Sequence, residues 1–117
     1  MNATAVLTTV LAVLFTAIGV AKLAAVPSMR ARAAHVGLGV TAYRGIGALE
    51  VAGAIGLVAG TVVPVLRTLA ALGLVLLLAG AVVAHLRAQD GLEEMVPALV
   101  LGGLSASLLV LSLGAFG

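Results

Sequence analysis

Four long apolar stretches, separated by short polar or glycine-containing segments, account for most of this chain. They predict helical spans at about residues 4–25, 42–61, 64–86 and 95–116. A helix needs about 20 apolar residues to cross the hydrocarbon core of a bilayer, so each stretch is long enough to span a membrane. Because the four spans nearly exhaust the 117 residues, we predict one transmembrane domain, residues 1–117, folded as an all-α four-helix membrane bundle.

The segment between the first two spans has a different pattern. Pro27 ends the first helix, and apolar residues then recur at helical spacing with Arg30 and Arg32 between them. This pattern predicts a short amphipathic helix that lies in the headgroup layer, with its arginines against lipid phosphates. His35 is in the same segment, and we interpret this lone interfacial histidine as an ordinary surface residue.

Composition agrees with a membrane protein and excludes several other classes. Hydrophobic residues make up 63% of the chain and charged residues only 9%, against roughly 25% charged residues in soluble domains. The absence of cysteine excludes disulfides and cysteine-ligated metals. His35 and His85 share no ligand spacing, so we predict no metal site. Because the chain has no basic run and few aromatic residues to stack on bases, we predict no nucleic-acid partner.

The positions of the basic residues predict the orientation in the membrane. Five of the six basic residues fall on the side that carries the two longer connections, and Arg67 alone falls on the other side. The positive-inside rule therefore places both longer connections in the cytoplasm and both termini outside. The first span has no basic residues before it, unlike a signal peptide, so we expect it to be retained in a multi-pass plasma-membrane protein.

Glu50 lies near the middle of the second span, where a carboxylate is costly. A charge at the bilayer centre costs roughly 2.5–3.5 kcal/mol on insertion scales, and such residues usually turn into the bundle and pair. Gly47 and Gly53 flank Glu50 on one face and allow another helix to approach. Gly56 and Gly60 form a GxxxG pair, which favours a close helix contact within the bundle or between subunits.

Polar groups from other spans are predicted on the cytoplasmic side of the bundle, within reach of Glu50. Lys22, about one turn from the end of the first span, either extends to the interface or faces inward and pairs with Glu50. His85, in the last turn of the third span, either complements the helix dipole or joins the same group. We predict one polar pocket that opens toward the cytoplasmic leaflet, lined by Lys22, Tyr43, Arg44, Glu50 and His85.

Three motifs in order give the chain a family resemblance. They are F-x3-G-x2-K in the first span, R-x2-G-x2-E-x2-GA-x-GL in the second, and GA-x3-H-x-R in the third; their chemistry-bearing residues are Phe15, Lys22, Arg44, Glu50, His85 and Arg87. This pattern resembles the DoxX-like family of small membrane proteins. The resemblance implies a four-helix membrane bundle, and it implies an association with membrane oxidoreductases because the family name comes from a subunit of a thiosulfate:quinone oxidoreductase.

Several functions agree with such a pocket, and the residues alone leave them open. The first is a subunit that binds a quinone or another lipid-soluble molecule for a partner oxidoreductase, with Lys22, Tyr43 and His85 as hydrogen-bond donors and Glu50 as proton relay. The second is an assembly or scaffold protein, a homo-oligomer or part of a membrane complex, in which a Lys22–Glu50 pair fixes the bundle. The third is an enzyme acting on a hydrophobic substrate with Glu50 and His85 as acid and base, and the fourth is a proton-coupled transporter. We favour the first because of the family association.

Overall fold

The computed structural model describes residues 2–114, and its secondary structure there is entirely helical. The helices are α1 (Ala3–Leu23), α2 (Pro27–His35), α3 (Val40–Ala59), α4 (Pro64–Arg87) and α5 (Leu92–Gly114). All but α2 are long and apolar enough to cross a membrane. The predicted all-helical fold, with four long apolar helices and a short helix after the first, is therefore confirmed. The predicted end of the last span, residue 116, lies outside the described residues.

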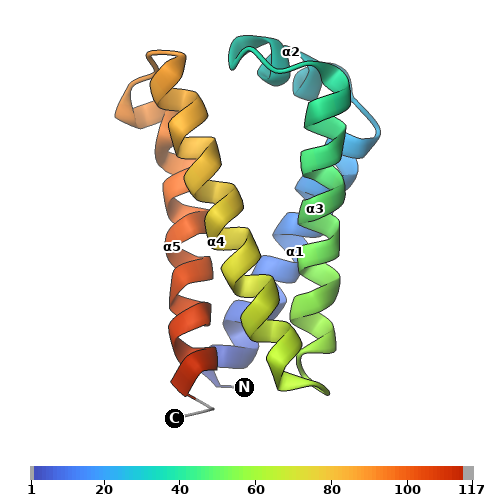
Figure 1. Ribbon diagram of the computed structural model, residues 1–117, viewed down its shortest axis with the longest axis vertical. Helices are drawn as coiled ribbons and strands as arrows, with labels where there is room; N and C mark the ends of the chain where they lie inside the picture. Colours follow the sequence, from blue (N-terminus) through green and yellow to red (C-terminus); the bar gives the residue numbers. More distant parts are fainter. Residues whose placement is uncertain (1, 115–117) are drawn as a thin grey trace.

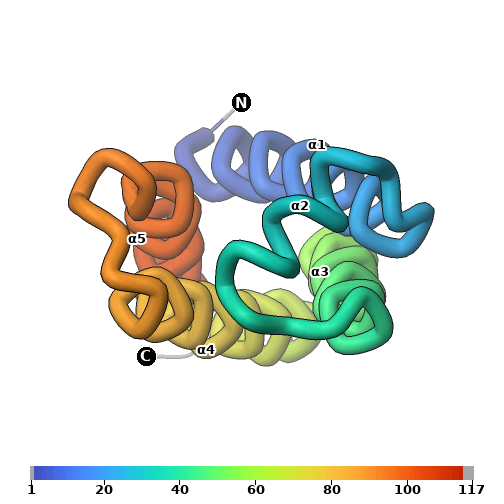
Figure 2. Tube along the Cα trace, turned by 90° about the horizontal axis from the view of Figure 1, so that it is seen from above, coloured from blue at the N-terminus to red at the C-terminus, as the bar shows by residue number. Residues whose placement is uncertain are grey.

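The four long helices form a ring. Going around it, α1 packs on α3, α3 on α4, α4 on α5, and α5 returns to α1 (Figure 2). The α1–α3 and α4–α5 pairs have the most extensive contacts, and the two pairs diverge toward the end that carries α2 (Figure 1). We call this end, which also holds the α4–α5 turn, the α2 end. We call the opposite end, where α1 begins and α5 ends, the terminal end.

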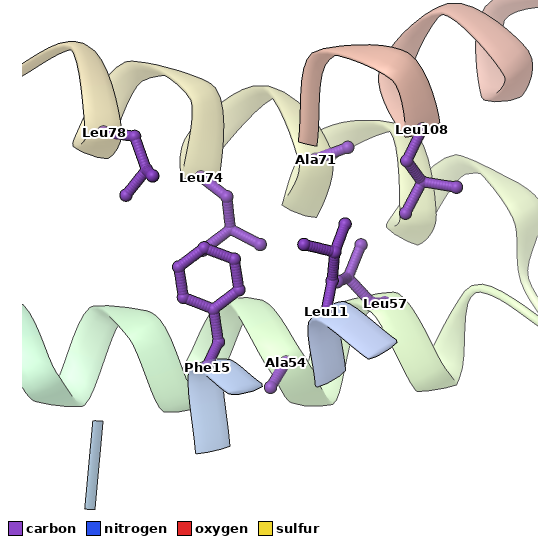
Figure 3. Close-up of a cluster of buried hydrophobic side chains, with 8 residues drawn as sticks. All are labelled: Leu11, Phe15, Ala54, Leu57, Ala71, Leu74, Leu78 and Leu108. Carbon is purple, nitrogen blue, oxygen red and sulfur yellow. The ribbon is translucent and has the colours of Figure 1, made fainter. Parts of the chain in front are cut away.

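The apolar core lies where the two helix pairs meet. Leu11 and Phe15 of α1 and Leu57 of α3 are fully buried, and their side chains point toward Leu74 of α4 and Leu108 of α5 (Figure 3). Most other large apolar side chains face outward, as expected when lipid is the solvent. The molecule is 41 Å long, close to the roughly 40–45 Å thickness of a bilayer with its headgroups.

Glycines allow the helices to approach within the chain. A Cβ atom added to Gly47 would lie 2.6 Å from the carbonyl oxygen of Gly19, so the α1 and α3 backbones touch there. Gly56 faces Ala70 of α4, and Gly60 lies directly against Arg67. The predicted close contact of the GxxxG pair is thus made with α4 of the same chain. Formation of a homo-oligomer stays a prediction.

Two helix ends are closed by residues in the left-handed region that are not glycine. Ala25 (φ 51°) follows α1, and Gln89 (φ 60°) follows α4. After Gln89, the Asp90 amide donates to the His85 carbonyl at 3.0 Å, the hydrogen bond that defines a Schellman cap. This cap folds the chain back over the end of α4 and brings the Asp90 side chain next to His85.

Candidate functional site

The lysine of α1 and the glutamate of α3 form an ion pair inside the bundle. Lys22 Nζ lies 2.6 Å from Glu50 Oε1, and the two side chains are only 14% and 3% exposed. Of the two interpretations of Lys22, the inward-facing one is therefore confirmed. The two hydrogen-bonding groups satisfy each other where water is scarce.

The glycine contact between α1 and α3 explains why these two side chains meet. Lys22 follows Gly19 by three residues, and Glu50 follows Gly47 by three, so each charged residue lies on the glycine face of its helix. The Lys22 Cβ lies level with Gly47, 2.7 Å from where a Cβ on that glycine would be. Since the helices run in opposite directions, the lysine stem reaches about one turn along α3 to the carboxylate.

Tyr43 completes this group from the other side of the ammonium. Its ring centroid lies 4.8 Å from Lys22 Nζ, within the range of a cation–π interaction. Tyr43 and Glu50 are seven residues apart on α3, so both face α1. The ammonium of Lys22 is therefore held between a carboxylate and an aromatic ring.

A narrow hollow adjoins the group under α2. Lys22 and Tyr43 line it together with residues of the α1–α2 turn and α2, among them Ala25, Met29 and Arg30. No part of it is wide enough for a water molecule. Glu50 is 2% exposed and does not line this hollow. The ion pair is closed, with its lysine side adjoining a space that has almost no free volume.

The other two predicted pocket residues lie elsewhere. Arg44 is exposed, and His85 is bonded to Asp90 rather than to Glu50, with His85 Nδ1 2.6 Å from Asp90 Oδ2. The single five-residue pocket predicted from the sequence is therefore divided in the structure. Lys22, Tyr43 and Glu50 come together, whereas His85 belongs to a second cluster.

This second cluster joins α2 to the α4–α5 turn. Asp90 Oδ1 lies 2.7 Å from His35 Nε2, so one carboxylate bridges His35 of α2 and His85 of α4. Two hydrogen bonds lower the pKa of Asp90, the one to His85 more than the one to His35. The sequence pattern indicated a surface position for His35 and no functional role for Asp90. The sequence feature that could have grouped His35, His85 and Asp90 is that all three fall at the end of the bundle that carries the two longer connections.

Four apolar helices around one internal ion pair define a small multi-pass membrane protein. The DoxX-like family model matches residues 6–108, which include both polar clusters. The chain belongs to the DoxX-like family, as the three motifs indicated. Comparison with curated proteins and with solved structures gave no match.

Proposed function

We propose that this protein is a non-catalytic subunit or assembly factor of a membrane complex, and that its Lys22–Glu50 pair holds α1 and α3 in register. The closure of the pair is the observation that carries this proposal. The carboxylate is 2% exposed, its partner is a lysine of the same chain, and the adjoining hollow cannot hold a water molecule. A group that binds substrate needs access that this arrangement does not offer.

The membrane setting explains why such a pair is useful. Helices in lipid gain little from burying apolar side chains, because the lipid tails are equally apolar, so packing and polar contacts determine which faces meet. Contact between Gly19 and Gly47 lets the two helices approach closely. The Lys22–Glu50 bond adds a directional polar contact that favours this rotation of the helices over others.

The family resemblance suggests the class of partner to test first, a membrane oxidoreductase. The experiment is affinity capture of the tagged chain from gently solubilised membranes of its own host, with quantitative identification of co-purified membrane enzymes. We expect an oxidoreductase to be enriched with the native chain and reduced with Glu50→Gln, with Arg87→Gln as a matched control for loss of an exposed charge. Recovery of the chain by itself from crosslinked membranes would contradict the proposal.

A second candidate function is supported by the hollow beside Lys22. Quinone carbonyls accept hydrogen bonds, and two residues with donor groups, Lys22 and Tyr43, are among those that line this hollow. Because it is too narrow as it stands, a quinone ring would enter only if α2 moved away. The helix α2 is short and contacts only α1 and α3 among the described helices, so its movement would have to break mainly these contacts and the His35–Asp90 hydrogen bond.

A thermal-shift titration of the purified chain tests quinone binding. We expect a short-chain ubiquinone or menaquinone to raise the melting temperature of the native chain and to have no effect on Lys22→Met or Tyr43→Phe. Equal shifts in all three proteins, or none in any, would leave the non-catalytic proposal as the better one.

An acid–base enzyme built on Glu50 and His85 gains no support, because the two residues have separate partners.

A further inference from the structure

A second hollow lies at the terminal end of the bundle, remote from the Lys22–Glu50 pair. It is a half-open depression of about 240 Å³ between the start of α1, the α3–α4 turn and the first turn of α4. Helices α1 and α4 are diagonal in the ring (Figure 2) and their described backbones do not approach closely, which leaves this space between them. Thr8 is buried at its α1 wall, and Leu11, about one turn deeper, belongs to the apolar core.

Arg67 lines this hollow and has no anionic side chain to pair with. Its Nε is buried without a hydrogen-bond partner among the described residues. The chain has only four acidic side chains. Glu50 is bonded to Lys22, and Asp90, Glu93 and Glu94 lie at the α2 end, whereas α4 begins at the terminal end (Figure 1). Because a guanidinium in a partly buried site favours a carboxylate or phosphate, and no described side chain supplies one, Arg67 is suited to bind an anion of another molecule.

Besides Arg67, the hollow is lined by Asn2, Ala5 and four threonines. Thr8, Thr9 and Thr61 each donate to a backbone carbonyl three or four residues earlier, at 2.7, 2.9 and 2.8 Å respectively. Their hydrogens are therefore used within the chain, and their oxygens keep lone pairs that accept hydrogen bonds. The hollow thus combines one strong anion-binding group with a row of acceptors suited to hydroxyl groups of a ligand.

We propose that this hollow binds the phosphate ester of a small polyol, with the phosphate on Arg67 and the polyol hydroxyls on the threonine wall. The phosphoglycerol headgroup of phosphatidylglycerol has this chemistry, and so does free glycerol phosphate. At the end of a 41 Å molecule, the hollow lies at the depth where lipid headgroups are found.

Titration of the full-length chain in a neutral detergent tests the proposal, with lipid binding counted by native mass spectrometry. We expect phosphatidylglycerol to bind more tightly than phosphatidylcholine, and Arg67→Gln to weaken that binding about tenfold or more, the effect of losing a charge-assisted hydrogen bond. The matched control, Arg87→Gln, removes an exposed cation at the α2 end and should leave binding unchanged. Equal weakening by the two variants would overturn the proposal.

A second comparison tests the threonine wall at a constant phosphate charge. Phosphatidylmethanol is an anionic phosphodiester like phosphatidylglycerol but lacks the headgroup hydroxyls, so the native chain should prefer phosphatidylglycerol. Thr9→Val, which keeps the shape of an exposed side chain, should reduce that preference. The same affinity for both lipids in the native chain would overturn the polyol assignment.

Competition by free glycerol phosphate would identify a soluble ligand, whereas binding of phosphatidylglycerol alone would identify a lipid. If neither molecule binds, the site is refuted.

Discussion

At the scale of single residues, the ion pair is the most consequential feature. Glu50 is nearly inaccessible, Lys22 is largely buried, and the two are bonded to each other, so the cost of burying each charge is offset mainly by the other. Replacing one partner of such a pair is strongly destabilising, because it leaves the other charge buried without a counter-ion. Replacing both partners by apolar residues is far less destabilising. This asymmetry distinguishes a structural pair from two residues that act independently.

We predict that Glu50→Leu and Lys22→Met will each lower the free energy of unfolding by about 3–5 kcal/mol, the range for removing one partner of a buried pair. The double variant should recover most of this loss, because two apolar side chains then pack in place of two charges. Denaturant unfolding in detergent micelles, followed by circular dichroism, measures all four proteins. Additive losses in the double variant would show that the two residues do not stabilise one another.

At the scale of helices, the contact between α1 and α3 depends on two glycines. The apposed backbones at Gly19 and Gly47 leave no space for a side chain, and this contact sets the distance at which Lys22 can reach the carboxylate. By contrast, Gly45 lies two residues away on α3 with open space around it. The same helix therefore offers a position where glycine is needed and one where it is not.

Gly47→Ala should destabilise the protein by about 1–3 kcal/mol, the usual cost of overpacking, because the new methyl group would collide with the Gly19 carbonyl and the Lys22 stem. Gly45→Ala should be neutral or stabilise by about 0.5–1 kcal/mol, since alanine restricts the unfolded chain more than glycine does. Unfolding midpoints of the two variants, measured side by side, test this difference. Equal effects would mean that α1 and α3 have room to separate.

At the scale of the whole molecule, the two helix pairs are joined by different means at the two ends. The apolar core joins them toward the terminal end, whereas at the α2 end Asp90 connects α2, which rests on α1 and α3, to the α4–α5 turn. Breaking the Asp90 bridge should therefore loosen α2 without unfolding the core.

The pH dependence of this bridge follows from the lowered pKa of Asp90, caused first by the hydrogen bond to His85 and then by the one to His35. A carboxyl group whose pKa is lower in the folded state adds stability above its unfolded-state pKa, and this stability is lost as the pH falls through the folded-state value. Hydrogen exchange in α2, corrected for intrinsic rates, should thus show no loss of protection from about pH 7 to 5 and increasing loss below about pH 4. Asp90→Asn should abolish this step, and its persistence in that variant would assign the effect to another group.

The orientation of the whole molecule can be tested because the chain has no cysteine. The positive-inside pattern predicts that α2 faces the cytoplasm and the α3–α4 turn faces outward. In intact cells a membrane-impermeant maleimide should label Val62→Cys, whose native side chain is 83% exposed, and should label Ser28→Cys only after permeabilisation. The reverse labelling would invert the assigned topology.

The sequence by itself determined the helices, their order and the need for an internal partner for Glu50. These properties depend on local composition: the length of an apolar run, the effect of Pro27, and the cost of a carboxylate in lipid apply to a segment before it packs. Lys22 was one of a few basic groups that could reach the required depth, so its pairing could be predicted as one of two alternatives.

Only the tertiary structure decided how the other polar residues are distributed. His85 bonds to Asp90 because a left-handed residue, Gln89, turns the chain back over α4, and glutamine is not the residue from which such a cap is expected. The hollow beside Arg67 exists because α1 and α4 are diagonal in the ring. Helix rotation, ring order and turn geometry depend on contacts between distant segments, and those contacts have no signature in the local hydrophobic pattern.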